Sequence, residues 1–146
     1  LGTQPAMLSK IKSEVLRGPA FAVLIAGGLL FAAIWYASQA AHAEAVQVRM
    51  PKLSAMGQAG QRSFAKNCAQ CHGAQAGGTD QGPPLIHRIY ESNHHGDGAF
   101  LRAATSGTRQ HHWRYGDMPP QPQIRRMEIQ AIIKFIREVQ RANGIN

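Results

Sequence analysis

Both cysteines of the chain lie in one pentapeptide, Cys68-Ala69-Gln70-Cys71-His72. Two thiols three positions apart on one helical turn can reach the two vinyl groups along one edge of a porphyrin. A histidine directly after them can turn its imidazole toward the central iron. Because this spacing is the attachment pattern of a c-type haem, the motif predicts one covalently attached haem, with thioether bonds at Cys68 and Cys71 and His72 as an iron ligand.

Two other kinds of site use a CxxC pair, a thioredoxin-like redox centre and half of a structural zinc site. A zinc site would need a second CxxC or an HxxxH pair elsewhere, and the chain has no third cysteine. A redox pair has no need of His72. Haem attachment therefore explains more of the pentapeptide than either alternative.

A second iron ligand is sought among the five methionines. Met7 precedes a long apolar run, Met50 and Met56 precede the cysteines, and Met127 belongs to the apolar stripe of a predicted helix, where a core role is expected. Met118 lies in a loop bounded by glycine and proline and can reach the opposite haem face. We therefore expect Met118 to be the second ligand; the alternative is an exposed loop methionine.

The composition is that of a folded chain of ordinary size. Of 146 residues, 44% are hydrophobic and 16% charged, which suits one compact core plus an appendage and excludes a large multidomain enzyme. A disordered chain is excluded because the charge density is low and the apolar clusters are strong. Two cysteines are too few for a disulfide-dense mini-protein.

The appendage is an apolar run near the N-terminus. Residues 18–41 contain no Asp, Glu, Lys or Arg, and a helix rising about 1.5 Å per residue can cross a bilayer core of about 30 Å with a run of this length. Lys10, Lys12 and Arg17 stand before the run, so the positive-inside rule predicts a cytoplasmic N-terminus and an exported remainder.

The run has two interpretations, an uncleaved membrane anchor and a cleaved signal peptide. Trp35-Tyr36 near its outer end favours an anchor, whereas Ala41-His42-Ala43 matches a signal-peptidase site. The first predicts a single-pass protein on the periplasmic side of the bacterial inner membrane, and the second a soluble periplasmic protein. The expected parts are a cytoplasmic segment, a transmembrane helix or signal peptide, a tether and a haem domain, at residues 1–17, 18–41, 42–53 and 54–146.

Helical patterns dominate the exported part. Residues 54–67 predict a helix with the first serine as its N-cap, and residues 99–106 predict a shorter one between Gly- and Pro-rich loops. Arg137 and Arg141 suit the C-terminal end of a last helix, which stops at Asn143-Gly144. Its apolar stripe has a period near 3.6 and consists of Ile124, Met127, Ile132, Ile133, Phe135, Ile136 and Val139. No alternating run argues for a sheet, so an all-α fold is expected.

The order of these signals resembles the small class I cytochromes c, which carry one haem, and in particular exported or membrane-anchored bacterial members. The resemblance rests on CAQCH after Phe64, on Gly82-Pro83-Pro84-Leu85, on Gly116-Asp117-Met118-Pro119, and on a last helix containing Ile132-Ile133-Lys134-Phe135-Ile136. It covers residues 54–146. Four signals in order are more specific than any one of them.

The resemblance implies a role for each matching position. Cys68 and Cys71 would hold the haem through thioethers, and His72 and Met118 would be the axial ligands. Pro83 matches the family proline whose carbonyl accepts the Nδ1 proton of the ligating histidine, a bond that orients the imidazole and tunes its basicity.

The resemblance also implies how the first and last helices of the domain meet. Gly60 and Phe64 match the small and aromatic positions at which the two helices cross, and Phe135 matches the aromatic partner. Pro84 departs from the family, which often has a polar residue there, but it touches no iron ligand.

A closed His/Met iron has no open position for a substrate. The chain is therefore predicted to be a one-electron carrier and not an enzyme, by itself or as a subunit of an oxidoreductase complex. Two alternatives stay open. One is a ligand-binding or peroxidase-like haem protein in which Met118 is labile, and the other is a copper-handling cytochrome that uses its paired histidines.

The paired histidines are His94-His95 and His111-His112, the second followed by Trp113. Neighbouring residues on an extended backbone point to opposite faces, so each pair is expected to offer one ligand to a copper or zinc ion. The more favoured interpretation is that one of these histidines, or Trp113, hydrogen-bonds a haem propionate. Displacement of Met118 from the iron by His111 or His112 is a further alternative.

The charge predicts an acidic partner. The chain carries a formal net charge of +8, with 13 Lys and Arg against 6 Asp and Glu from residue 49 onward. Such a basic domain suits an acidic redox protein or a membrane oxidoreductase, with faster docking at low salt. The alternative is a generally solvated basic surface, since no dense block of charge appears. No nucleic-acid partner is expected for an exported chain, and no phosphate loop or Ser-His-Asp order stands out.

Overall fold

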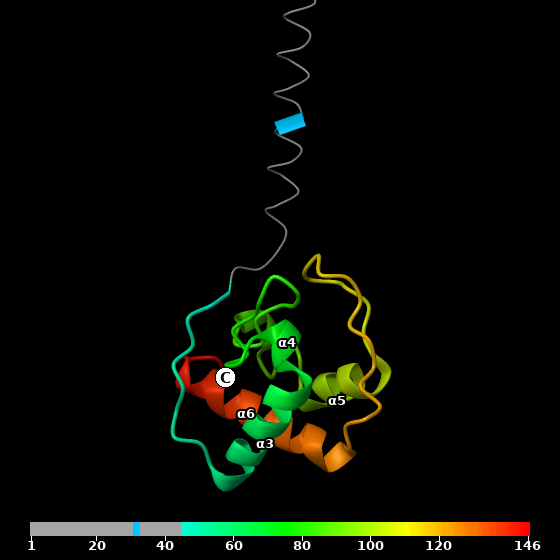
Figure 1. The fold of residues 1–146 in the computed structure, drawn as a ribbon. Helices are drawn as coiled ribbons and strands as arrows, with labels where there is room; N and C mark the ends of the chain where they lie inside the picture. Colours follow the sequence, from blue (N-terminus) through cyan, green and yellow to red (C-terminus); the bar gives the residue numbers. More distant parts are fainter. Residues whose placement is uncertain (1–30, 33–44) are drawn as a thin grey trace, which may run out of the picture. The chain divides into compact units, whose positions relative to one another are not determined.

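The computed structural model describes residues 31–32 and 45–146, and the second range belongs to one compact unit, His42–Asn146. Its helices in chain order are α3 (Ala55–Asn67), α4 (Ala69–His72), the 3-10 helix η1 (Arg88–Tyr90), α5 (Asp97–Ser106) and α6 (Arg126–Ala142) (Figure 1). Among the described residues the extended pairing is a single antiparallel bridge between Thr108 and Met118. This part of the chain is therefore mostly helical and has no strand, as the sequence predicts.

The expected cytoplasmic segment, 1–17, and the expected span or signal, 18–41, lie outside the described residues except for two helical positions, 31 and 32. Within the ranges that are described, no helix is both long and apolar enough to cross a bilayer.

The described part of the expected tether, residues 45–53, packs along the domain. The Val46 N–H donates to the Gly77 carbonyl at 2.8 Å. The Asn143 side chain accepts from the Arg49 N–H and donates to the Arg49 carbonyl, each at 2.9 Å. The segment is therefore joined to both the haem-motif loop and the end of α6.

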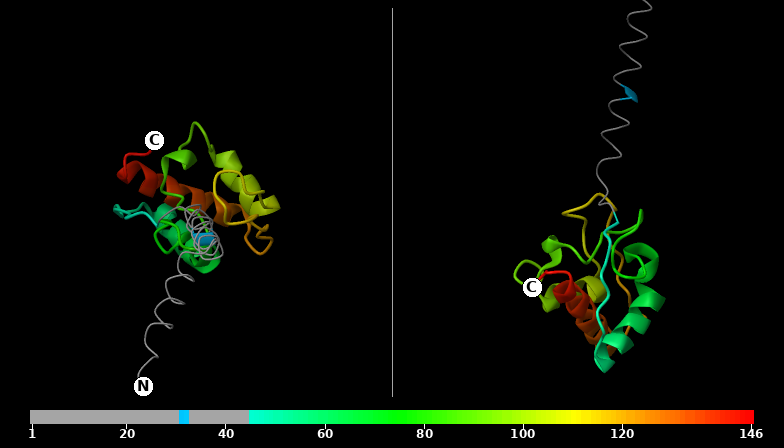
Figure 2. Two further views of the ribbon diagram at one scale, coloured as in Figure 1. Left: turned by 90° about the horizontal axis from the view of Figure 1, so that it is seen from above. Right: turned by 90° about the vertical axis from the view of Figure 1, so that its left-hand side faces the viewer.

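The centre of the core is the crossing of α3 and α6 (Figures 1 and 2). Phe64 and Phe135 are fully buried there, with ring centroids 5.3 Å apart and planes at 53°, a tilted arrangement that aromatic pairs favour. A Cβ at Gly60 would lie 1.9 Å from the Ala131 carbonyl oxygen. The helices approach this closely because α3 has no side chain at residue 60, as the resemblance implies.

The helix boundaries differ from the sequence expectation in two places. Helix α5 begins at Asp97, two residues before the expected start. Helix α6 begins after Ile124, which is buried in the loop before it. The expectation that Met127 has a core role is wrong, because its side chain is 79% exposed. It lies two positions before the buried Ile129, about 200° around the helix.

Glu138 on α6 links that helix to the start of α3. Its carboxylate accepts from the Ser54 N–H at 3.0 Å and from the Ser54 hydroxyl at 2.6 Å, while the same hydroxyl accepts from the Gly57 N–H as the N-cap of α3. Burial raises the pKa of Glu138, but the two bonds from Ser54 and the charge of Lys134 outweigh it and hold the pKa below its usual 4.5.

A carboxylate with a lowered native pKa stabilises the fold above its unfolded pKa, and this stabilisation is lost as the pH falls through the lowered value. We expect Glu138→Gln to reduce the free energy of unfolding by about 1 kcal/mol at neutral pH. In strong acid, where the native carboxyl is also protonated, the reduction should vanish. Urea unfolding at a series of pH values measures the difference. Asp80→Asn, which removes an exposed carboxylate, is the matched control, and a pH-independent effect of Glu138→Gln would contradict this role.

Candidate cofactor site

A cavity of about 580 Å³ opens among α3, α5, α6 and the loop that follows α5, a volume typical of cofactor sites. One wall is apolar and comes from a single face of α6, through Ile129, Ile132, Ile133 and Ile136. Four of the five site residues expected from the sequence also line the cavity: Cys68, His72, Pro83 and Met118. The fifth, Cys71, is exposed and free.

The two cysteines are held on one turn. Cys68 is the residue between α3 and α4, and its carbonyl accepts from the Cys71 N–H at 3.2 Å and from the His72 N–H at 2.9 Å. Neither cysteine forms a disulfide. Burial, and then the neighbouring Cys71, raises the pKa of Cys68 to about 11. Since neither sulfur is in a disulfide, both are available for thioether bonds.

His72 is buried and its ring is oriented by a backbone carbonyl. Its Nδ1 lies 2.9 Å from the Pro83 oxygen. Because a carbonyl can only accept, Nδ1 carries the proton and Nε2 keeps the lone pair. Burial lowers the pKa of His72, although the bond to Pro83 opposes the shift. The imidazole is therefore neutral near pH 7, the state in which histidine ligates metals.

Glycine lets the Pro83 loop approach the haem motif. A Cβ at Gly82 would lie 2.8 Å from the Cys71 carbonyl oxygen. The same carbonyl accepts from the Thr79 hydroxyl at 2.6 Å. The loop therefore closes over the cysteine turn, and this closure brings the Pro83 carbonyl within reach of the His72 ring.

Met118 lines the cavity from the loop between α5 and α6. Its N–H and carbonyl exchange hydrogen bonds with Thr108 at 2.9 and 3.0 Å. Gly107 has a φ of +75°, and a Cβ there would lie 2.7 Å from the Met118 oxygen. The glycine thus permits the bridge that places the half-buried Met118 side chain in the cavity wall.

Trp113 is one of the residues predicted from the sequence to hydrogen-bond a haem propionate. Its indole Nε1 is buried and, among the described residues, has no hydrogen-bond partner of normal geometry. Burial raises the pKa of Tyr90, and the Trp113 side chain, as a nearby donor, offsets part of that rise. A haem fits these residues, since its carboxylates would satisfy the buried indole N–H while thiols, a neutral imidazole and an apolar wall surround its ring.

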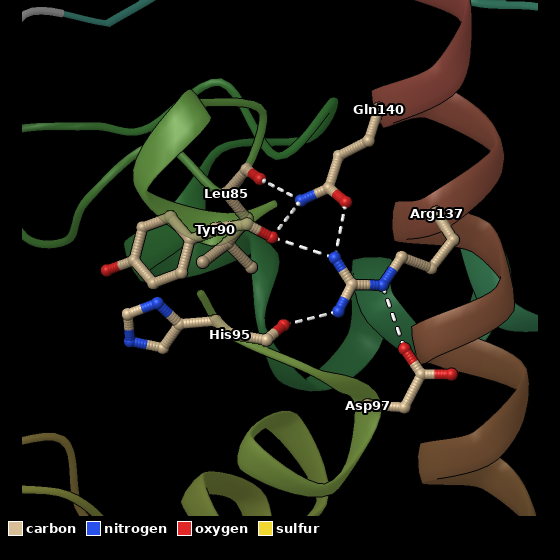
Figure 3. Close-up of polar contacts among 6 residues, drawn as sticks. All are labelled: Leu85, Tyr90, His95, Asp97, Arg137 and Gln140. Atoms are coloured by element: carbon tan, nitrogen blue, oxygen red, sulfur yellow. Dashed lines mark hydrogen bonds and ion pairs between the residues drawn. The ribbon is translucent and has the colours of Figure 1, made fainter. Parts of the chain in front are cut away.

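A polar network connects the segment from Tyr90 to Asp97 with α6 (Figure 3). The Arg137 guanidinium donates to Asp97 at 2.8 Å, to the Tyr90 carbonyl at 2.7 Å, and to the His95 carbonyl. Gln140 accepts from Arg137 at 2.7 Å. The sequence predicts only that Arg137 lies near the end of the last helix, and it does not predict that the side chain is buried. It is only 8% exposed, because the Asp97, Tyr90 and His95 acceptors come from a segment 40 to 47 residues away in the chain.

Gln140 completes this network. It is 1% exposed, and its amide donates to the Leu85 carbonyl at 2.8 Å and to the Tyr90 carbonyl at 3.0 Å. The loop after the haem motif and the loop before α5 are therefore both anchored on one turn of α6.

The paired histidines are arranged differently from the sequence expectation. His94 and His95 follow a turn in which both N–H groups bond to the Glu91 carbonyl, so their backbone is not extended. Both face the second pair: His94 Nε2 lies 3.3 Å from His112 Nε2, and His95 Nε2 lies 3.4 Å from His111 Nε2. The expectation that each pair offers a single ligand atom is therefore wrong for the first pair, since His94 and His95 each place a ligand atom within 4.8 Å of one on His112.

A mostly helical domain in which a CxxCH turn, an oriented neutral histidine and a methionine meet in one apolar cavity defines the haem-carrying electron-transfer class of proteins. Comparison with protein families agrees: the Cytochrome c family matches residues 57–140, more than half of the chain. The chain belongs to the cytochrome c family, and membership implies covalently bound c-type haem and electron transport. Neither a curated protein nor a solved structure matches the chain significantly.

Proposed function

We propose that this cytochrome c is of class I, with one haem whose iron is held by His72 and Met118, and that it carries single electrons between redox partners. The observation that carries the proposal is the convergence of His72 and Met118 on one cavity from separate segments. When bound, the haem supplies an iron that takes up and releases one electron.

The chain's own residues have distinct tasks in this proposal. The Cys68 and Cys71 thiols would form the two thioethers. Pro83 holds the Nδ1 proton of His72, which keeps the Nε2 lone pair free for the iron. Met118 would close the sixth position and raise the reduction potential relative to two imidazoles. The isoleucine face of α6 excludes water, which favours the less charged ferrous state.

The remaining proposals concern place and partner. We propose that the run at 18–41 anchors the domain on the periplasmic side of a bacterial inner membrane, with release after signal cleavage as the alternative. The partner would be an acidic redox protein or a membrane oxidoreductase, because the net charge of +8 favours encounter with an acidic face. Nothing in this proposal requires a catalytic group.

The test is the absorption spectrum of the haem-loaded chain, ferric and ferrous, with and without carbon monoxide. A closed His/Met site is expected to give a ferrous spectrum that carbon monoxide leaves unchanged, and a weak long-wavelength ferric band from methionine sulfur on iron. Ready carbon monoxide binding by the unaltered protein would mean that Met118 does not hold the iron. The ligand-binding or peroxidase-like function would then replace electron transfer.

A further inference from the structure

Four histidines outside the proposed iron ligands gather at the cavity: His94, His95, His111 and His112. We call them the histidine cluster. The first two lie between η1 and α5, and the other two lie in the loop that leads to Met118. One ligand atom each from His94, His95 and His112 lies within 4.8 Å of the other two. The fold therefore brings together four imidazoles that electron transfer does not use.

Two rings of the cluster have their protons assigned by backbone carbonyls. His95 Nδ1 lies 2.7 Å from the Ile89 oxygen, and His111 Nδ1 lies 2.7 Å from the Arg109 oxygen. Since a carbonyl only accepts, both Nδ1 atoms carry a proton. In the neutral rings both Nε2 atoms then hold lone pairs, and these atoms face each other at 3.4 Å. Two lone pairs at this distance face the same space, which a cation can occupy.

Protonation is disfavoured at two of the four rings, His95 and His112. Burial lowers the pKa of His95; the Ile89 carbonyl opposes this, and the charges of His94, His111 and Arg137 lower it further. The pKa of His112 is also lowered, first by burial and then by the charges of His111, His95 and His94. The guanidinium of Arg137 donates to the His95 carbonyl and so stands close to the cluster. The geometry of the facing nitrogens, and not their titration, is what makes the cluster a candidate metal site.

The two cross-pair separations fit tetrahedral coordination, and one ligand atom each of His94, His95 and His112 lies within 4.8 Å of the other two. Four nitrogens at 2.0–2.1 Å from a zinc ion lie about 3.3–3.4 Å apart in a tetrahedron, whereas neighbouring ligands of a square-planar ion would lie about 2.8 Å apart. The cross-pair distances are 3.3 and 3.4 Å. Carbonyls that fix the second ring nitrogen, as on His95 and His111, are the usual outer partners of metal-binding histidines.

We propose that the histidine cluster binds one divalent transition-metal ion, Zn²⁺ by its geometry, at the edge of the haem cavity. The site is distinct from the iron site, since neither His72 nor Met118 belongs to it. The proposal rests on Met118, and not His111 or His112, being the sixth iron ligand. The two proposals can fail separately, because zinc binding is measured by dialysis whereas the iron ligands are tested by the haem absorption spectrum.

The experiment uses the haem-loaded full chain and Zn²⁺ alone, in equilibrium dialysis near neutral pH. We expect one zinc ion per chain, and X-ray absorption at the zinc edge is expected to show four nitrogen neighbours at about 2.0–2.1 Å. The double variant His94→Gln/His112→Gln removes one ligand from each pair and should weaken binding by about 100-fold or more. An unchanged haem spectrum in that variant shows that the domain is still folded.

The matched control is His87→Asn, a histidine outside the cluster. His87 caps η1 by accepting from the Ile89 N–H at 3.2 Å, and asparagine preserves an acceptor there. This variant should bind zinc as the unaltered protein does. The proposal is overturned by any of three results: no stoichiometric zinc in the unaltered protein, retained affinity in the double variant, or loss of binding in the control.

Discussion

Replacing Gly60 with alanine is expected to reduce the free energy of unfolding by at least about 3 kcal/mol, because the added methyl group has no space. The Cβ would lie 1.9 Å from the carbonyl oxygen of Ala131 and 2.4 Å from its carbon. Both atoms belong to the backbone of α6, so no flexible side chain can move aside. The helices would have to separate, which opens the contact between Phe64 and Phe135. Urea unfolding of the haem-loaded protein measures the loss.

A second glycine provides the control for this prediction. Gly98 lies inside α5, and the nearest atom to a Cβ there is the end of the flexible Arg102 side chain at 3.3 Å. Gly98→Ala should therefore be neutral or stabilise the fold by up to about 1 kcal/mol, since alanine favours a helix. If Gly60→Ala behaved like Gly98→Ala, the close approach of α3 and α6 would be wrong.

The second large effect is expected from Met118→Ala. The unaltered protein should not bind carbon monoxide, whereas the variant should bind it fully at saturation and lose the long-wavelength ferric band. The midpoint potential should also fall, because methionine ligation raises it. The Thr108 bridge uses only the backbone of residue 118, so the loop should keep its shape in the variant. Absorption spectroscopy with and without carbon monoxide is the measurement.

Met127→Ala is the matched control for this variant. Met127 is a methionine of the same domain, but its side chain is 79% exposed on α6. Removing it should leave the spectrum, the potential and the response to carbon monoxide unchanged. A Met118→Ala protein that still excludes carbon monoxide would show that another side chain closes the iron. His111 and His112 are the first candidates, because they line the same cavity.

Local patterns predicted the helices well and their edges less well. The serine N-cap and the 54–67 pattern correspond to α3 at Ala55–Asn67, and the Asn143-Gly144 stop corresponds to the end of α6. Ile124 is in the core as expected but lies before the helix, whereas Met127 was misplaced because apolar residue type alone does not show which side of a helix faces the core. That side depends on where α3 crosses.

The burial of Arg137 also could not be predicted from local sequence patterns. An arginine near a helix C-terminus is normally a surface charge, and nothing beside Arg137 in the sequence indicates otherwise. It is buried because Tyr90, His95 and Asp97 present oxygens to it from another segment. A buried position for an arginine arises only where such acceptors converge, and convergence is a tertiary property.

The chemistry of attachment is readable from the sequence, because helical geometry acts over a few residues and places two thiols and a histidine at fixed spacing on one turn. The sequence also singled out Met118 as a candidate ligand from its loop. The pairing of Thr108 with Met118, the burial of the Trp113 indole N–H and the facing of the two histidine pairs are set by the tertiary structure. These contacts join segments separated by ten or more residues or depend on burial, and their geometry is set by how the whole core packs.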